Sequence, residues 1–340
     1  MTALPDIPFE DLGNSGWDKL LHRHRDRAQE LIRQGRKLVH PMPLQALDGL
    51  SRRWAQKCDH HHYATITRMA KNMPSGLWFM NFCYEWGCTT RVGLDANSGK
   101  PIMLRSLDWP FDGIGRTVVM AKKNGQTATP YFAATWPGYT GVITGMKPKR
   151  FAIAINQAPL SAPIQFLVAN WSIARGRVWR SRSITPGHLV EKVFEETEDF
   201  DEAKRRLCET PIALPVIFSL VGVKPGECCV IERMEHSFRL RNGDAVAANH
   251  WESYSQRATA RGADSPGRAT CLASTPLPPE KTFSWAIPPV LNGDTRLAAE
   301  ISPAESTFHL RGYEKDGPAT KDFDLAEHMS DTRSRVAQKI

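Results

Sequence analysis

The first 75 residues show the apolar spacing of amphipathic helices. Between Trp17 and Val39, apolar side chains recur at intervals of three to four residues with charged residues between them, which is the period of a helix. Two further helices are expected over Leu44–Lys57 and His60–Asn72, and the Pro-Ser-Gly run that begins at Pro74 ends the series. The pattern therefore predicts a helical N-terminal segment.

Beyond Gly76 the pattern changes to short apolar runs separated by turn-forming residues. The first group of strands is expected at Cys88–Leu94, Ile102–Leu107, Thr117–Ala121, Tyr131–Ala134, Thr140–Thr144 and Phe151–Ile155. Three helices and three more strands are expected at Pro163–Arg175, Pro186–Glu196, Asp201–Cys208, Val216–Val223, Glu227–Ile231 and Phe238–Arg241. This order of elements indicates an α+β fold with two sheets covered by helices. The charged tail after Glu314 is expected to fray.

The composition is that of a globular protein. Of 340 residues, 41% are hydrophobic and 24% are charged, which excludes wholesale disorder, a collagen-like chain and a small disulfide scaffold. The longest apolar stretch, Gly76–Trp86, is shorter than the ~18 residues of a membrane span and is interrupted by Asn81 and Glu85. The first residues lack the basic start and apolar core of a signal peptide. We therefore expect a soluble, cytoplasmic protein with no integral membrane segment.

The formal net charge of +8 is spread along the chain. Basic clusters such as Arg175–Arg182 are interpreted as solvated helix faces, and the alternative is peripheral contact with anionic lipid. No nucleic-acid-binding signature is present, so we expect no nucleic-acid partner. Cys58 stands beside His60, His61 and His62, but neighbouring residues cannot all face one ion and no second ligand group is evident. We therefore expect no metal site and no cofactor.

A thiol, a guanidinium and a carboxylate are predicted to meet on one hairpin. Cys88 opens the first strong strand, and the next strand carries Arg105 and Asp108. A neighbouring cation lowers the pKa of a thiol and favours the nucleophilic thiolate. If Cys88 is itself a chain terminus, its α-amino group, with an ordinary pKa near 8, can act as the base. The structural alternative is a packed cysteine beside a surface ion pair, which contributes under ~1 kcal/mol.

These residues also carry a resemblance to a known family. The chain resembles the acid ceramidase and N-acylethanolamine-hydrolysing acid amidase group of N-terminal nucleophile (Ntn) hydrolases, which is related to choloylglycine hydrolase and penicillin V acylase. The matching segments follow in the family's order between residues 76 and about 312. They begin at Cys88, Arg105, Trp136, Phe151, Thr197, Ala248 and Pro288.

The resemblance implies a self-cleaving precursor with a four-layer αββα sandwich. The family cuts its own chain immediately before the cysteine, which here is the Gly87–Cys88 bond. Residues 1–87, the helical segment, would form the smaller subunit, and residues 88–340 the Ntn-hydrolase domain. The two pieces are expected to stay associated because the apolar stretch Leu77–Phe82 would be buried against the larger piece.

The resemblance also implies a role for each candidate residue. Cys88 would be the nucleophile, Asp108 would hold its amine, and Arg105 would lie beside the sulfur. Asn249 would donate to the oxyanion, and Asn156 would lie at a strand end near the site. Arg268 would fill the position of a family arginine, with Arg257 and Arg261 as alternatives. Gln157 and Ala158 stand where the lipid-amide members have Glu and Arg.

Together these inferences predict a cofactor-free cysteine amidase. It would hydrolyse a linear N-acyl or lipid amide with a medium to long acyl chain through an acyl-cysteine intermediate. The alternatives are an acyltransferase of the same fold that uses an amine acceptor, and a non-catalytic lipid-binding relative.

Overall fold

The computed structural model describes residues 3–38, 41–83, 86–162 and 164–329. Its helices are α1 (Trp17–Arg23), α2 (Arg25–Leu38), α3 (Pro41–Lys57), α4 (Tyr63–Ala70), α5 (Leu77–Phe82), α6 (Ile114–Thr117), α7 (Leu167–Arg180), α8 (Pro186–Glu196), α9 (Phe200–Glu209) and α10 (Ser265–Ala273). No helix in this described part of the chain is both long and apolar enough to cross a membrane.

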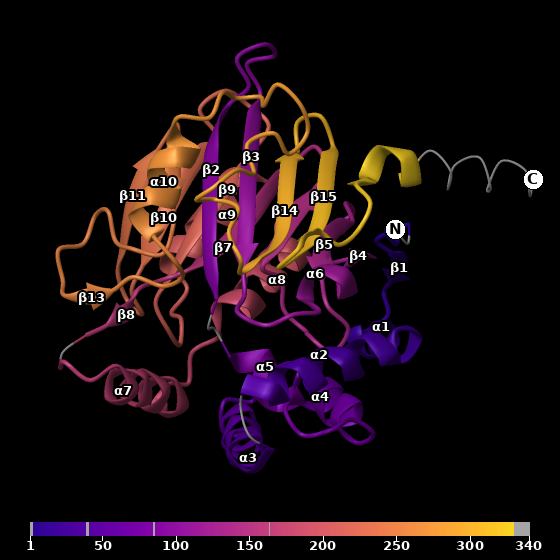
Figure 1. The fold of residues 1–340 in the computed structure, drawn as a ribbon, viewed down its shortest axis with the longest axis vertical. Helices are drawn as coiled ribbons and strands as arrows, with labels where there is room; N and C mark the ends of the chain where they lie inside the picture. The colour runs from indigo at the N-terminus through magenta and orange to yellow at the C-terminus, as the bar shows by residue number, and fades with distance from the viewer. Residues whose placement is uncertain (1–2, 39–40, 84–85, 163, 330–340) are drawn as a thin grey trace, which may run out of the picture.

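Two mainly antiparallel sheets form the centre of the protein (Figure 1). The first has the order β1 (Phe9–Gly13), β4 (Val119–Lys123), β5 (Tyr131–Thr135), β6 (Thr144–Lys147), β7 (Phe151–Gln157), β9 (Val216–Val221), β10 (Cys228–Arg233) and β11 (Phe238–Asn242). The second has the order β12 (Ala245–Ala247), β2 (Gly87–Leu94), β3 (Pro101–Asp108), β14 (Thr295–Ser302), β15 (Thr307–Glu314) and β16 (Gly317–Pro318), with β17 (Phe323–Asp324) also paired to β15. A separate pair joins β8 (Leu160–Ser161) to β13 (Ala258–Thr259).

The sheets pack face to face and helices cover their outer faces. Strands β2 and β3 contact β7 and β9 across the interior, α8 and α9 pack on the first sheet, and α6 and α10 pack on the second. Apolar side chains alternate accordingly along β3, since Met103 lies in the core between the sheets and Leu104 lies in the outer core with Leu272 of α10. The predicted four-layer αββα arrangement is therefore confirmed.

The N-terminal segment is more than a set of helices. Helices α1 to α5 gather at one end of the sheets (Figure 1), but Phe9–Gly13 forms strand β1, which pairs in parallel with β4 at the edge of the first sheet. This strand was not predicted from the sequence because it is short and its partner lies more than 100 residues away. The apolar stretch Leu77–Phe82 is a helix, α5, with its aromatic side chains buried.

Several predicted boundaries were wrong. The strand expected at Thr140–Thr144 is mostly a loop, because the Thr140 N–H donates to the Asn81 side chain and the Val142 N–H to the Gly187 carbonyl instead of to a neighbouring strand. Helix α7 spans Leu167–Arg180 and so lies later in the chain than the expected Pro163–Arg175. Residue 163 lies outside the described residues. The tail after Glu314 stays on the sheet through β16 and β17, and residues 330–340 lie outside the description.

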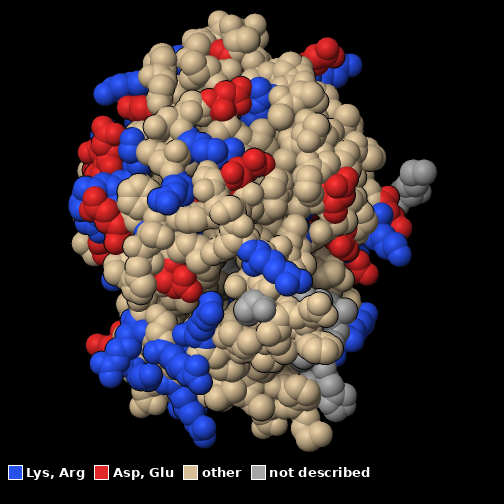
Figure 2. Space-filling view, turned by 90° about the vertical axis from the view of Figure 1, so that its left-hand side faces the viewer, with Lys and Arg blue, Asp and Glu red and all other residues tan. Residues whose placement is uncertain are grey.

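The basic cluster near α7 divides into exposed and buried members. Arg177, Arg180 and Arg182 are exposed, and Figure 2 shows Lys and Arg side chains gathered at the lower end of the face where α7 lies. Arg175 is instead buried and donates to the Phe82 carbonyl oxygen at 2.9 Å. One member of the cluster therefore joins α7 to the end of α5.

Candidate active site

The predicted hairpin carries the candidate nucleophile. Strands β2 and β3 pair antiparallel, with Gly87 opposite Asp108, Cys88 opposite Leu107 and Thr90 opposite Arg105. The side chains of Cys88 and Arg105 are completely buried. The register brings all three residues to one end of the second sheet. Because side chains alternate along a strand, Cys88 and Arg105 share the inner face and Asp108 lies on the outer face, so the predicted convergence is only partly met.

The Cys88 thiol lies between the two sheets. Its Sγ is 3.4 Å from the Ile155 carbonyl oxygen of β7. Burial raises the pKa of the thiol, while the Arg105 guanidinium acts in the opposite direction. Arg105 Nε donates to Thr144 Oγ1, and its Nη2 has no hydrogen-bond partner among the described residues. A buried N–H donor is thus available beside the thiol for a substrate oxygen or a thiolate.

Asn249 holds the backbone nitrogen of Cys88. The Cys88 N–H donates to Asn249 Oδ1 at 2.7 Å, and Asn249 Nδ2 donates to the Gln157 carbonyl oxygen at 2.8 Å. The Asn249 N–H in turn donates to Ser265 Oγ at 2.8 Å. An amide nitrogen carries two N–H groups, so the bond to Gln157 occupies one of them. In this structure Asn249 Oδ1 therefore acts as the acceptor for the peptide N–H of Cys88.

Arg268, in the first turn of α10, hydrogen-bonds directly to Cys88. It is fully buried and its Nη1 donates to the Cys88 carbonyl oxygen and to Thr89 Oγ1, both at 2.7 Å. Its Nη2 donates to Asn249 Oδ1 at 3.0 Å. Of the alternatives, Arg261 donates to the Ala158 carbonyl oxygen and Arg257 is exposed. Only Arg268 of these three hydrogen-bonds to Cys88 in the part of the chain that is described.

Asp108 completes the cluster from β3. Its Oδ2 is 3.2 Å from Arg268 Nη1, and its Oδ1 accepts from Thr295 Oγ1 at 3.0 Å. Burial raises the pKa of the carboxyl, and Arg268 lowers it. Its Oδ2 also lies close to Gly87, where an added Cβ would be 3.3 Å away. The described residues show no hydrogen bond from the Cys88 peptide nitrogen to Asp108, so the contact expected between a free Cys88 amine and Asp108 stays a prediction.

Asn156 of β7 links the two sheets. Its Oδ1 accepts from Thr90 Oγ1 at 2.6 Å, and its Nδ2 donates to the Ala247 carbonyl oxygen at 2.9 Å. These bonds join β7 to β2 and β12 across the interior. Its neighbour Gln157 contacts the chain close to Cys88, since its Oε1 accepts from the Trp86 N–H at 2.7 Å. Gln157 therefore holds the chain two residues before Cys88.

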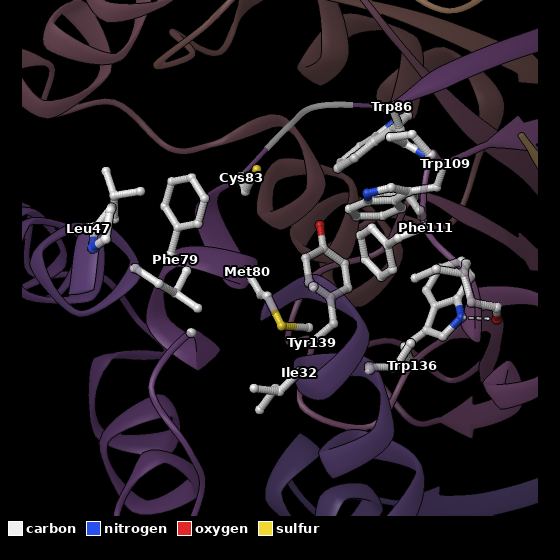
Figure 3. Close-up of a pocket in the computed structure, with 18 of the residues that line it drawn as sticks. Ile32, Leu47, Phe79, Met80, Cys83, Trp86, Trp109, Phe111, Trp136 and Tyr139 are labelled. Carbon is white, nitrogen blue, oxygen red and sulfur yellow. Dashed lines mark hydrogen bonds between the residues drawn. The ribbon is translucent and has the colours of Figure 1, made fainter. Parts of the chain in front are cut away.

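An apolar pocket opens between the N-terminal helices and the hairpin (Figure 3). Its cavity volume is about 670 Å³. The labelled residues in Figure 3 come from both sides of the Gly87–Cys88 bond and are Ile32, Leu47, Phe79, Met80, Cys83, Trp86, Trp109, Phe111, Trp136 and Tyr139. A smaller hollow of about 340 Å³ shares Trp86 and Pro110 with this pocket and extends to Gly87 and Asp108. The apolar space therefore adjoins the bond before Cys88.

The sequence indicated only one wall of this pocket, the apolar stretch Gly76–Trp86. The other walls come from α2 and α3 and from Trp109 and Trp136, which follow β3 and β5. Thr295, which supports Asp108 from a distant strand, was not predicted as a site residue. A single group of described side chains has metal-ligand spacing, His61, His62 and Glu191. These residues lie between α3 and α4 and on α8, whereas Cys88 lies on β2.

Part of the chain is similar in sequence to known proteins. The chain matches no protein-family profile. It is 31% identical to N-acylethanolamine-hydrolyzing acid amidase of Rattus norvegicus over 160 residues, which are 45% of this chain and 41% of that protein. It is 34% identical to acid ceramidase of Mus musculus over 106 residues, which are 31% of this chain and 25% of that protein. The matched part is thus less than half of each relative's length.

Among solved structures, the fold matches a Caenorhabditis elegans N-acylethanolamine-hydrolyzing acid amidase ortholog with a TM-score of 0.52 and 16% identity, covering 70% of this chain and all of that one. At this identity the structural match shows the fold alone. The chain is therefore similar in part of its sequence to N-acylethanolamine-hydrolyzing acid amidase and acid ceramidase, and its fold is similar to that of the amidase ortholog.

Proposed function

We propose that this protein is a self-processing cysteine amidase that hydrolyses linear N-acyl amides through an acyl-cysteine intermediate. The observation that carries the proposal is the environment of Cys88, whose thiol lies beside Arg105 while its peptide nitrogen is held by Asn249. The names of the related proteins support amide hydrolysis as the reaction.

Processing would begin with attack of Cys88 Sγ on the Gly87 carbonyl carbon. The C–N bond then breaks, the acyl group moves to sulfur as a thioester, and the Cys88 nitrogen takes a proton and becomes an amine. Water hydrolyses the thioester, which releases the Gly87 carboxylate and restores the thiol. Asn249 and Arg268 hold the nitrogen and the carbonyl oxygen of Cys88 in place for this shift.

Gly87 suits this bond because there is little room for a side chain. A Cβ added to Gly87 would lie 3.2 Å from Asp108 Cβ and 3.3 Å from the Gly262 Cα atom. Such contacts are tighter than ordinary packing, so a larger residue would push the carbonyl away from the thiol. The small residue therefore lets the scissile bond approach the carboxylate and the nucleophile closely.

In the mature enzyme the new α-amine would serve as the general base for the thiol. Asn249 Oδ1 already accepts from this nitrogen and would continue to orient it. The substrate carbonyl carbon would be attacked by Sγ, the protonated amine would protonate the departing nitrogen, and water would then release the acyl group. The Arg105 guanidinium and the second Asn249 N–H would stabilise the oxyanion, a contribution of about 3 kcal/mol for one donor.

The apolar pocket would hold the acyl chain. Its cavity of about 670 Å³ falls in the ~300–1,000 Å³ range of small-molecule sites. Its walls are apolar and aromatic, including Phe79, Met80 and Trp109, so a hydrocarbon chain gains free energy with every buried methylene. A short or charged acyl group would leave this surface unfilled. We therefore expect a preference for medium to long acyl chains.

The two pieces would remain together after cleavage. Strand β1 is hydrogen-bonded into the first sheet and α5 is buried, so the smaller piece keeps both a sheet contact and an apolar contact. Asn81 of α5 adds hydrogen bonds to the Gly138 carbonyl and from the Thr140 N–H. Separation would expose this surface to water.

A substrate panel tests the proposed activity. N-acyl amines, N-acyl amino acids and penicillin V, varied in acyl-chain length, are incubated with the wild-type protein and with Cys88→Ala. We expect hydrolysis that rises with acyl length and is absent in Cys88→Ala. Equal activity in both proteins would overturn the proposal. Repeating the assay with added amines separates the hydrolase from an acyltransferase, because only the latter would form the new amide as its main product.

A further inference from the structure

A cluster of imidazoles and one carboxylate lies where the N-terminal helices meet the first sheet's helical layer. His61 and His62 occupy the turn between α3 and α4, and Glu191 is on α8. Glu191 is completely buried, whereas the side chains of His61 and His62 are 29% and 14% exposed to solvent. A buried carboxylate is retained only with compensating partners, so its surroundings need an explanation.

The two oxygens of Glu191 have different partners. Oε1 accepts from the Trp17 indole N–H and lies 3.6 Å from the Lys123 ammonium. Oε2 is hydrogen-bonded to His62 Nε2 and lies 3.5 Å from His61 Nε2. Two imidazole nitrogens therefore approach one oxygen atom. These three atoms all lie within 4.8 Å of one another, a spacing that a single ion can bridge.

The local charge favours a cation at this point. Lys123 is shared between Glu191 and Glu195, whose Oε1 lies 3.4 Å from its ammonium. With neutral imidazoles, two carboxylates therefore face one ammonium group, and one negative charge is left over. Lys123 lies on the Oε1 side of Glu191, and Oε2 is the oxygen that the two histidines approach.

We propose that His61 Nε2, His62 Nε2 and Glu191 Oε2 bind one zinc ion, with water as the fourth ligand. Imidazole and carboxylate groups are the ligands that Zn²⁺ takes in tetrahedral sites, at about 2.0–2.2 Å. Small movements of the rings suffice to admit an ion at that distance. The partly exposed His61 leaves a path for the ion and for the water ligand.

The ion would tie the N-terminal segment to the main body. Its two histidine ligands come from the residues before the Gly87–Cys88 bond and its carboxylate from α8 after it. His60 belongs to the same run, but its ring packs edge-on against that of His188 and stacks on that of His61. The nearby Cys58 Sγ contacts the Ser181 carbonyl oxygen. No metal site was expected from the sequence because no second ligand group was evident, and the fold supplies one, Glu191, 129 residues after His62.

Metal analysis of the full chain tests the site. Wild type, His61→Gln and His236→Gln are incubated with Zn²⁺, freed of excess ion by gel filtration and analysed by elemental mass spectrometry. His61→Gln removes the most exposed ligand, and His236→Gln is the control at an exposed histidine outside the cluster. We expect about one zinc per chain in wild type and His236→Gln, and an affinity at least ~10–100-fold weaker in His61→Gln.

Thermal unfolding with and without Zn²⁺ gives a second measurement that does not depend on activity. An ion that binds only the folded chain raises the Tm, and this rise should occur in wild type and His236→Gln but be reduced in His61→Gln. Cobalt(II) should also give the strong visible absorption of a tetrahedral site in the first two proteins alone. No bound zinc in wild type, or equal zinc content and equal Tm shifts in all three proteins, would overturn the assignment.

Discussion

Filling the apolar pocket should change which acyl chains the protein accepts. Gly35 lies on α2 and lines the pocket, and a Cβ added there would meet no atom within 4 Å. Gly35→Leu therefore introduces a side chain without a backbone clash. The substitution also replaces a poor helix former with a good one, which stabilises a helix by up to about 1 kcal/mol. The fold should be unaffected while the cavity becomes smaller.

The expected magnitude follows from the carbon atoms displaced. A leucine side chain adds about four carbons, so it takes the room of about four carbons of the acyl chain in a closely packed cavity. At about 0.8 kcal/mol per buried methylene, an acyl chain that fills the wild-type pocket would lose roughly 3 kcal/mol of binding in the transition state. That loss corresponds to a decrease of about 200-fold in kcat/KM. Shorter chains, which do not reach Gly35, should be unaffected.

The assay is kcat/KM across a series of N-acyl amides that share one leaving group and differ in chain length. Gly49→Leu is the matched control, because Gly49 is exposed on α3 outside the pocket and an added Cβ there also meets no atom within 4 Å. We expect the optimum of Gly35→Leu to move about four carbons shorter and that of Gly49→Leu to match wild type. An unchanged profile in Gly35→Leu, or the same shift in both variants, would refute the assignment of this cavity to the acyl chain.

Three further predictions concern the site and the fold. Asp108→Asn and Arg105→Met should fold, as judged by circular dichroism, and lose at least ~100-fold in hydrolysis rate, because the first removes the carboxylate expected to hold the Cys88 amine and the second removes the cation beside the thiol; wild-type rates in either would show that the hairpin charges are not used. In the uncut fraction at pH 7, Cys88 should react with iodoacetamide more slowly than the partly exposed Cys271, since burial shields the thiol and raises its pKa; peptide mass spectrometry measures both rates, and faster labelling of Cys88 would contradict this. Gly115→Ala should lower the free energy of unfolding in urea by about 1–3 kcal/mol, because the new Cβ would lie 1.8 Å from the Tyr313 carbonyl oxygen. Gly176→Ala, in open space on α7, should not destabilise the protein, and equal losses in the two variants would count against the close packing of α6 on β15.

Local patterns predicted the centre of the fold well. The hairpin of β2 and β3 was readable because both strands are strong apolar runs joined by a short polar turn, and its register places Cys88 near Arg105 and Asp108. Helix α8 has the predicted bounds, Pro186–Glu196, since a proline at its start and a regular apolar spacing mark it. Such signals are carried by residues close together in the chain.

Features made by distant residues could not be predicted in the same way. Strand β1 is short and depends on its pairing with β4, so its own residues carry little strand signal. Arg268 was one of three candidate arginines, and only the packing of α10 against β2 distinguishes it. Gln157 was noted as a departure from the family, but its bond to the Trp86 N–H depends on the position of β7. Its effect on the reaction stays a prediction.

The central claim is that Cys88 cuts the chain at its own peptide bond and then acts as the nucleophile. Intact-mass analysis of the purified wild-type protein and of Cys88→Ala, under native and denaturing conditions, tests it most directly. The account predicts that denatured wild type gives two fragments that meet at Gly87–Cys88, that the native protein retains both in one particle, and that Cys88→Ala gives a single uncut chain. A wild-type chain that stays intact while hydrolysing amides, or a Cys88→Ala chain that is still cut at this bond, would contradict it.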